Sequence, residues 1–273
     1  SHRTTASTDM IVQPPSEDQR QAVESIRKFL AAEIRPVAAE YRDRHIPRQK
    51  MRDITQGIAD FVLPGASVPR QLGGLGFSTA TEAMLFEELC TVSVDIALCV
   101  MINKGAAVVL AALPPQQAEL RERYLPELLA GRAFGGFGIG EPDTVADLTG
   151  LSLAPATEAG HIVLDGQKGW VSNGHYADFV IVAARASEQA ERSYVLVDRK
   201  AHGFESRNID KIALNSQSTA QLFFNGTKVP EHNILGRDGS DASGRLRLFE
   251  KAHASAGMLA VGLMRAALEA SIA

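Results

Sequence analysis

The chain has 273 residues, of which 45% are hydrophobic and 22% charged, and its formal net charge is −4 at neutral pH. This balance is ordinary for a globular protein, and the length allows one to three domains. The lack of a basic stripe argues against a nucleic-acid-binding protein. The seven histidines are scattered and no CxxC or HExxH spacing occurs, so the sequence predicts no metal site.

The N-terminal segment, residues 1–15, is polar and unpatterned, which predicts disorder. It has no apolar core of the kind that a signal peptide needs. The longest apolar stretch of the chain, IALCVMINKGAAVVLAAL, is broken by Asn103, Lys104 and Gly105, so we expect no transmembrane helix. A cytoplasmic protein is the default expectation.

Residues 16–131 are expected to form an all-α domain. Apolar residues recur every three or four positions from Val23 to Ile34, which predicts an amphipathic helix with Ser16 as a candidate N-cap. A shorter helix closes this region and ends at Gly131.

Within this domain, residues 79–113 carry small and apolar side chains on nearly every face, as buried helices do. Both cysteines of the chain, Cys90 and Cys99, lie in this single helix-like stretch. We therefore interpret them as buried thiols of a reducing compartment and not as a disulfide framework.

The pattern changes after Gly131, where short apolar or alternating runs are separated by Gly, Asn, Asp and Pro. This is typical of an antiparallel β domain, predicted over residues 132–240. From about Ser243 the helical pattern returns, and it has no stop signal before Ala273. The sequence thus predicts an α+β multidomain protein, with residues 241–273 beginning another all-α region.

The stretch GGFGIG, residues 135–140, does not have the GxGxxG spacing of a dinucleotide loop, and no βαβ pattern follows it. A Rossmann site is therefore not predicted. The alternative is a strand in which the glycines, having no side chain, let a ligand or another segment approach the backbone closely.

Trp170, the only tryptophan of the chain, lies in the stretch DGQKGWVSNG and has two interpretations. A lone tryptophan in a β domain is more often a core residue than the wall of a ligand site. What favours the wall is the combination of motifs along the chain. A strand ending in FGIGEP precedes Trp170, and the stretches VPEHNILG and FEKAHASAGMLAVGLMRAAL follow it.

In this order and spacing the chain resembles the acyl-CoA dehydrogenase family of flavoproteins, from about Ser16 to Ala273. DGQKGWVSNG resembles the family's strand and loop in which Trp-x-Thr/Ser lies against the flavin. KVPEHNILG resembles its V-x-V-P-x-x-N-x-L-G strand, and VPRQLGGLG resembles its P-E-x-x-G-G-x-G loop. The resemblance implies an N-terminal α domain, a β-barrel-like middle domain and a C-terminal four-helix bundle, of which residues 241–273 would be the first helix.

The resemblance also implies FAD, held between the middle domain and the bundle. Trp170 would lie against the flavin face, and Ser172 would offer its hydroxyl or backbone N–H to flavin N5. Phe137, Ile139 and Gly140 would supply strand backbone to the pyrimidine edge. These residue types suit a flavin, because a flat aromatic system gains contact area from an indole and its N5, O2 and O4 atoms need donors at fixed points.

On the substrate side the chain departs from the family pattern. Gly140 stands where the family usually has a flavin-binding Thr, and Ala146 stands where it often has a Ser that contacts the acyl-thioester arm. The helix beginning at Leu246, near which the thioester is expected, carries Glu250 and His253 where the family often has Asp/Glu-x-x-Arg. The side chain of His253 is a hydrogen-bond donor that is shorter than arginine and, unlike arginine, titratable.

The catalytic carboxylate is expected beyond Ala273, because in the family the later bundle helices carry it, together with part of the FAD site and the tetramer core. Glu250 is the only local candidate for a base, and Glu141 is expected to fix its loop. Either the sequence is a fragment or a short protein takes these helices from another subunit, and the lack of a helix stop at Ala273 favours the fragment.

The leading hypothesis is an FAD-dependent oxidoreductase that acts on the Cα–Cβ bond of an acyl thioester and passes hydride to flavin N5. The acyl carrier is coenzyme A or acyl carrier protein. The resemblance implies a homodimer or homotetramer formed through the C-terminal helices, with an electron-acceptor flavoprotein as a further partner. Two alternatives stay open, a flavin monooxygenase of the same fold and a non-catalytic acyl- or partner-binding relative.

Overall fold

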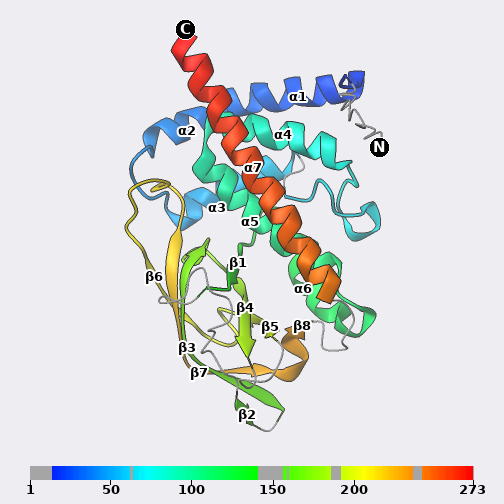
Figure 1. Cartoon of the computed structure of the whole chain (residues 1–273), viewed down its shortest axis with the longest axis vertical. Helices are drawn as coiled ribbons and strands as arrows, with labels where there is room; N and C mark the ends of the chain where they lie inside the picture. Colours follow the sequence, from blue (N-terminus) through cyan, green and yellow to red (C-terminus); the bar gives the residue numbers. More distant parts are fainter. Residues whose placement is uncertain are drawn as a thin grey trace, which may run out of the picture.

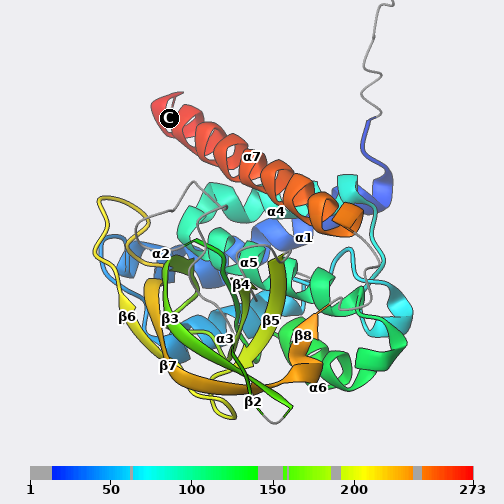
Figure 2. The same cartoon turned by 60° about the horizontal axis from the view of Figure 1, so that its bottom comes forward.

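The computed structural model describes residues 14–61, 64–140, 156–158, 160–185, 192–235 and 242–272. Helices form one layer, two β-sheets form the other, and a long C-terminal helix crosses the outer side of the helical layer (Figures 1 and 2). The predicted order of a helical domain, a β domain and a C-terminal helix is confirmed.

The helical elements are α1 (Glu17–Phe29), η1 (Leu30–Ile34, a π-helical turn), α2 (Arg35–Glu40), α3 (Arg48–Ala59), η2 (Arg70–Leu72), α4 (Thr79–Val92), α5 (Val94–Ala111), η3 (Pro115–Gln117), α6 (Ala118–Leu129), η4 (Glu231–Asn233) and α7 (Ala242–Ile272). The strands are β1 (Gly135–Gly138), β2 (Ala156–Glu158), β3 (His161–Ser172), β4 (Phe179–Arg185), β5 (Arg192–Asp198), β6 (Glu205–Asn208), β7 (Thr219–Pro230) and β8 (Ile234–Leu235).

Serine side chains begin three of the helices. The side-chain hydroxyl of Ser16 accepts a hydrogen bond from the backbone N–H of Gln19, and the backbone N–H of Ser16 donates to the side-chain Oε1 of Gln19. This is the capping box of α1, at the N-cap position that the sequence predicted. Ser93 accepts from the N–H of Ile96 and separates α4 from α5, so residues 79–113 form two helices and not one stretch.

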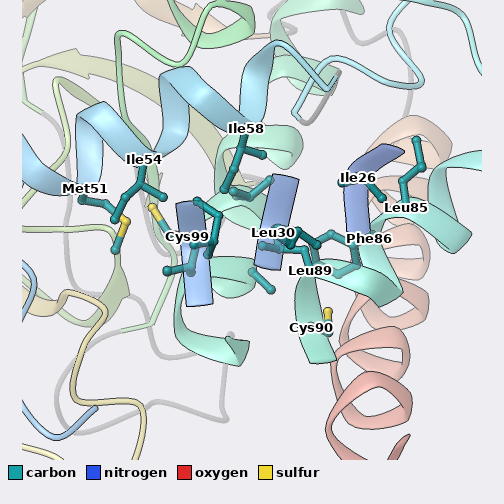
Figure 3. Packing of buried hydrophobic residues seen from close by; sticks show 14 of the residues in the cluster. Ile26, Leu30, Met51, Ile54, Ile58, Leu85, Phe86, Leu89, Cys90 and Cys99 are labelled. Atoms are coloured by element: carbon teal, nitrogen blue, oxygen red, sulfur yellow. The ribbon is translucent and has the colours of Figure 1, made fainter. Parts of the chain in front are cut away.

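The helices α1, η1, α3, α4 and α5 contribute to an apolar core within the helical layer (Figure 3). Cys90 and Cys99 lie inside it as free thiols, which confirms that they are buried. Burial raises the pKa of Cys90 to about 12 and raises that of Cys99 as well. Neither thiol is a reactive thiolate at neutral pH.

α5 runs as one helix through Asn103, Lys104 and Gly105, so the polar residues that interrupt the apolar stretch do not interrupt the helix. By length and composition alone, two described helices could cross a membrane: Val94–Ala111, of mean hydropathy 1.9, and Ser255–Ile272, of mean hydropathy 1.2. This is weak evidence for a membrane segment, because the core helix of a protein without one passes the same test and α5 contributes to two buried clusters.

The strands form two four-stranded sheets, in the orders β1-β4-β5-β8 and β2-β3-β7-β6. Over the described residues the sheets do not close into a barrel, which corrects the expectation of a barrel-like domain. All pairs are antiparallel except β1 and β4, which are parallel from Gly135 opposite Phe179 to Gly138 opposite Val182. The chain between them is long enough for such a crossover, since it includes a strand of the other sheet.

β4 is buried on both faces. Val180, Val182 and Ala184 face β3 and β7 across the space between the sheets. Phe179 and Ile181 point the other way, into a cluster with α5 and α6. This strict alternation explains why the segment reads as a nearly continuous apolar run in the sequence.

Polar contacts join the helical layer to the β-sheets at the start of β4. The carboxylate of Asp178 pairs with Arg48 and Arg52 of α3 and accepts from the backbone N–H of Phe134. Tyr176 is fully buried and donates its hydroxyl to the carbonyl oxygen of Ile46 at 2.7 Å. The two layers therefore meet over a fixed junction, which positions β1 against α5.

Candidate functional site

The end of β1 and the end of β3 meet at one edge of the β layer. The backbone N–H of Gly169 donates to the carbonyl oxygen of Gly140 at 3.1 Å. The stretches FGIG and KGWVS, which are about thirty residues apart in the sequence, therefore lie side by side. Three of the five predicted flavin-contacting residues, Phe137, Trp170 and Ser172, belong to β1 and β3. The other two, Ile139 and Gly140, directly follow β1, and Gly140 makes the contact itself.

Trp170 stands on a β-bulge, because the register of β3 against β7 shifts between Lys168 and Val171. Its backbone is left-handed, with φ of 54°, and its side chain is 52% exposed. A left-handed conformation costs a bulky residue about 1–3 kcal/mol. The core interpretation of Trp170 is therefore wrong, because the indole is held outward at a conformational cost.

The residues next to Trp170 present backbone groups and a side-chain hydroxyl at this edge. The ring of Phe137 packs on α5 at Gly105, while Ile139 and Gly140 are partly exposed after the strand ends. Ser172 is partly buried opposite Thr219. Within the described part of the chain, neither the hydroxyl of Ser172 nor the indole N–H of Trp170 makes a hydrogen bond.

Below this edge lies a buried polar cluster that the sequence did not single out. Asn173 is fully buried and left-handed, with φ of 61°, and its amide reaches Cys99, Asn103 and Gly135. Lys168 is also fully buried, with its stem against Gly138. The only sequence signals for this cluster were an Asn-Gly dipeptide after β3 and a polar residue within an apolar helix.

The predicted substrate-side residues lie outside the description that the structure gives. Ala146 and Glu141 fall in residues 141–155, which are not described. Glu250 and His253 lie on α7, but their side chains are outside the described part of the chain. Their roles stay predictions.

A polar cleft of about 270 Å³ opens elsewhere, between the loop before α3 and the loop that joins β6 to β7. Burial lowers the pKa of both His45 and Lys211 at this cleft. The ammonium group of Lys211 already donates to Gln217 and Thr219, so its charge is used within the protein. Among the described residues, no group of three or more His, Cys, Asp or Glu side chains could hold a metal ion.

The edge around Trp170 fits one face and one rim of a flat heteroaromatic group. The exposed indole offers stacking area, Ser172 offers a hydroxyl donor, and the strand end at Ile139 and Gly140 offers backbone. This donor set matches the isoalloxazine ring of a flavin, which has an apolar face and a polar edge.

Comparison with known proteins gives a consistent result. The profile of the acyl-CoA dehydrogenase N-terminal domain matches residues 16–132, and that of the middle domain matches residues 136–227. The mitochondrial isovaleryl-CoA dehydrogenase of Pongo abelii is 29% identical over 229 residues, which are 82% of this chain and 54% of that protein. This chain thus spans about half the length of that relative.

Solved structures share the fold. A complex of glutaryl-CoA dehydrogenase with glutaryl-CoA superimposes with a TM-score of 0.86 at 25% identity, over 95% of this chain and 67% of that one. A glutaryl-CoA dehydrogenase of Mycobacterium smegmatis in complex with FADH2 gives a TM-score of 0.84 at 22% identity, over 94% and 65% of the two chains.

Proposed function

Since the chain belongs to the acyl-CoA dehydrogenase family, we propose that it is an FAD-dependent oxidoreductase that acts on the Cα–Cβ bond of an acyl-CoA. The observation that carries this proposal is Trp170, which is exposed on a left-handed bulge beside the end of β1. An exposed tryptophan in a conformationally costly position is best explained by a ligand that uses its indole.

We assign the flavin-facing roles residue by residue. Trp170 lies against one face of the isoalloxazine ring, and Ser172 donates a hydrogen bond to its N5 edge. The backbone at Phe137, Ile139 and Gly140 contacts the pyrimidine edge. When bound, FAD would supply the acceptor for the hydride that leaves Cβ while a carboxylate removes the proton from Cα.

The acyl carrier is proposed to be coenzyme A, because the relatives named above are acyl-CoA dehydrogenases. Acyl carrier protein is the alternative carrier. Ala146, Glu250 and His253 are proposed to line the thioester arm. The catalytic carboxylate is proposed to lie beyond Ala273, and Glu250 is the candidate before it.

The proposed function extends to the assembly and the location of the protein. We propose a homo-oligomer formed through the C-terminal helices, an electron-acceptor flavoprotein as partner and a cytoplasmic location. In support, α7 exposes the apolar side chains of Leu263, Met264, Leu268 and Ile272, which are between 55% and 77% exposed. Such a face is suited to further helix packing.

The test is anaerobic titration of the purified full-length protein, loaded with FAD, with a panel of acyl-CoAs and the same acyl groups on acyl carrier protein. We expect at least one acyl-CoA to bleach the oxidised flavin, because the β-hydride leaves without oxygen. Dithionite serves as the positive control for reducibility. FAD that dithionite bleaches but no thioester does would contradict the dehydrogenase proposal. Admitting oxygen to the dithionite-reduced protein with the substrate then separates the two alternatives: an oxygenated product would favour the monooxygenase, and flavin reoxidation with unchanged substrate would favour the non-catalytic relative.

A further inference from the structure

We propose that Asn173 and Asn103 are positioning residues that fix Trp170 and Ser172 against the flavin. The proposal rests on the flavin site proposed above and extends it to two buried amides behind that site. Neither amide is assigned contact with the flavin. Each acts through the backbone that carries the flavin-facing side chains.

Asn173 holds the turn that follows Trp170. The turn is closed by the N–H of Gly174, which donates to the carbonyl oxygen of Val171 at 3.0 Å. Asn173 occupies the left-handed position of this turn, which asparagine tolerates better than most residues. Its own backbone N–H donates to Ser218 at 2.9 Å, so the turn is also tied to the start of β7.

The side-chain amide of Asn173 connects this turn to two other elements. Its Nδ2 donates to the carbonyl oxygen of Cys99 at 3.0 Å, and it lies 3.3 Å from the carbonyl oxygen of Gly135. Cys99 belongs to α5 and Gly135 begins β1. A single buried group therefore binds the end of β3 to the helix and to the strand that leads to Gly140.

Asn103 completes the connection from the helix side. Its Oδ1 accepts from the backbone N–H of Gly135 at 3.0 Å and from the amide of Asn173 at 3.3 Å, and its Nδ2 donates to Ala133 at 3.3 Å. Asn103 is 1% exposed and Asn173 0%. Of the four side-chain amide atoms, only the Oδ1 of Asn173 has no hydrogen-bond partner among the described residues. Because a buried polar group without a partner is costly, the bonds of the other three atoms favour one register of β1 against the turn.

The consequence is geometric. Trp170 is held by one strand and Gly140 by another, and the flavin-binding edge exists only while the two keep their relative position. The bulge at Trp170 is conformationally costly, so without the amides the residue is free to relax toward the ordinary β region. Binding of a flavin would then also have to fix the conformation of Trp170, and this entropic cost would lower the affinity for the flavin.

The experiment uses Trp170 as its own reporter, because all tryptophan fluorescence of the chain comes from this residue. N173G removes the amide and keeps the left-handed backbone accessible, since glycine adopts positive φ without strain. N103A removes the second amide within a helix. The matched control is N233A, because Asn233 is equally buried, at 2%, and donates to Leu196 at 2.7 Å at the far side of the β layer.

Two readouts are taken for each folded variant: the fluorescence anisotropy decay of Trp170 in the apoprotein, and the FAD dissociation constant from quenching of Trp170. We expect N173G and N103A to show faster local motion of the indole and to bind FAD about tenfold more weakly. N233A is expected to lose comparable thermal stability, with unchanged indole motion and FAD affinity within about twofold of the parent protein.

Indole motion in N173G and N103A that matches that of N233A would overturn the inference. Failure of both variants to fold would also overturn it, because the network would then serve folding and not positioning. Absence of FAD binding to the parent protein would contradict the proposed function instead, and the apoprotein anisotropy would still decide whether the amides position Trp170.

Discussion

At the scale of single residues, the molecule puts its one tryptophan where folding gains little from it. Half of the Trp170 surface is exposed, and its backbone is left-handed. Burial of an indole usually contributes several kcal/mol, so leaving it outside forgoes much of that gain. This combination of lost burial and a costly conformation is typical of residues kept for binding.

The first prediction concerns Trp170 itself. W170A is expected to change the free energy of unfolding of the apoprotein by less than about 1 kcal/mol, because the side chain is exposed, whereas truncation of a buried tryptophan costs about 3–5 kcal/mol. W170G is expected to stabilise the apoprotein by up to about 1 kcal/mol, since glycine removes the strain of positive φ. Both variants should bind FAD more weakly. Thermal unfolding of the apoprotein and flavin fluorescence titration measure the two effects, and a large stability loss in W170A with unchanged FAD affinity would refute the role of the indole.

At the scale of elements, the sequence predicted those that rest on local periodicity and missed those that rest on tertiary pairing. The capping box at Ser16 and the return of helix after Ser243 follow from residues close in the chain. The break at Ser93 was also within reach, since a serine followed by an acidic residue in the first turn is a helix-start signal.

Other features of the elements depend on residues far apart in the chain. β1 pairs in parallel with β4 because of where the intervening sheet returns the chain, and no local pattern encodes that. The bulge at Trp170 depends on β7 and on the contact between Gly169 and Gly140. The pairing of Asn103 with Asn173 spans 70 residues. The sequence therefore indicated the strand ends that meet at Trp170, but not the buried amides that hold them together.

The second prediction concerns how α7 sits on the helical layer. A Cβ added at Gly262 would lie 2.3 Å from the Cβ of Cys90 and 3.1 Å from the carbonyl oxygen of Glu87, so α7 touches α4 there through its backbone. G262A is therefore expected to weaken the packing of α7 and to lower the melting temperature, although alanine favours helices.

The matched control is G257A on the same helix, where nothing described lies within 4 Å of an added Cβ. This variant should gain up to about 1 kcal/mol, because only helix propensity changes. Thermal unfolding of the two variants side by side separates the effects. A G262A protein as stable as G257A would show that α7 does not pack on Cys90 in solution.

At the scale of the whole molecule, polar contacts join the helical layer to the β layer. Arg48 and Arg52 reach Asp178 across the junction, and Tyr176 reaches the loop before α3. His45 stacks on Tyr176 at a centroid distance of 5.1 Å. The junction therefore contains a histidine whose charge state influences how well the layers hold together.

The last prediction is a loss of stability in mild acid. Burial lowers the pKa of His45, His175 and His202 below the ordinary value of 6.5, so the folded state binds fewer protons than the unfolded chain in that range. The three neutral histidines stabilise the folded state fully at pH values above the pKa that they have in the unfolded chain. This stabilisation is lost as the pH falls through their lower pKa in the folded state. Carboxylates with a lowered pKa, such as Glu127, lose their stabilising effect on the folded state only below about pH 4.5. The interval between about pH 7 and pH 5 therefore isolates the histidines.

The variant that tests this mechanism is H202N. The Nδ1 of His202 accepts from the backbone N–H of Asp198 at 2.9 Å, which requires an unprotonated nitrogen, and an asparagine oxygen can replace this acceptor without titrating. Denaturant unfolding of the parent protein, H202N and the double variant H45Q/H202N is measured at several pH values in this interval. We expect the free energy of unfolding of the parent protein to fall with pH, the slope to decrease in H202N, and the double variant to be the flattest. Equal slopes in all three proteins would show that these histidines are not the groups that link protonation to folding.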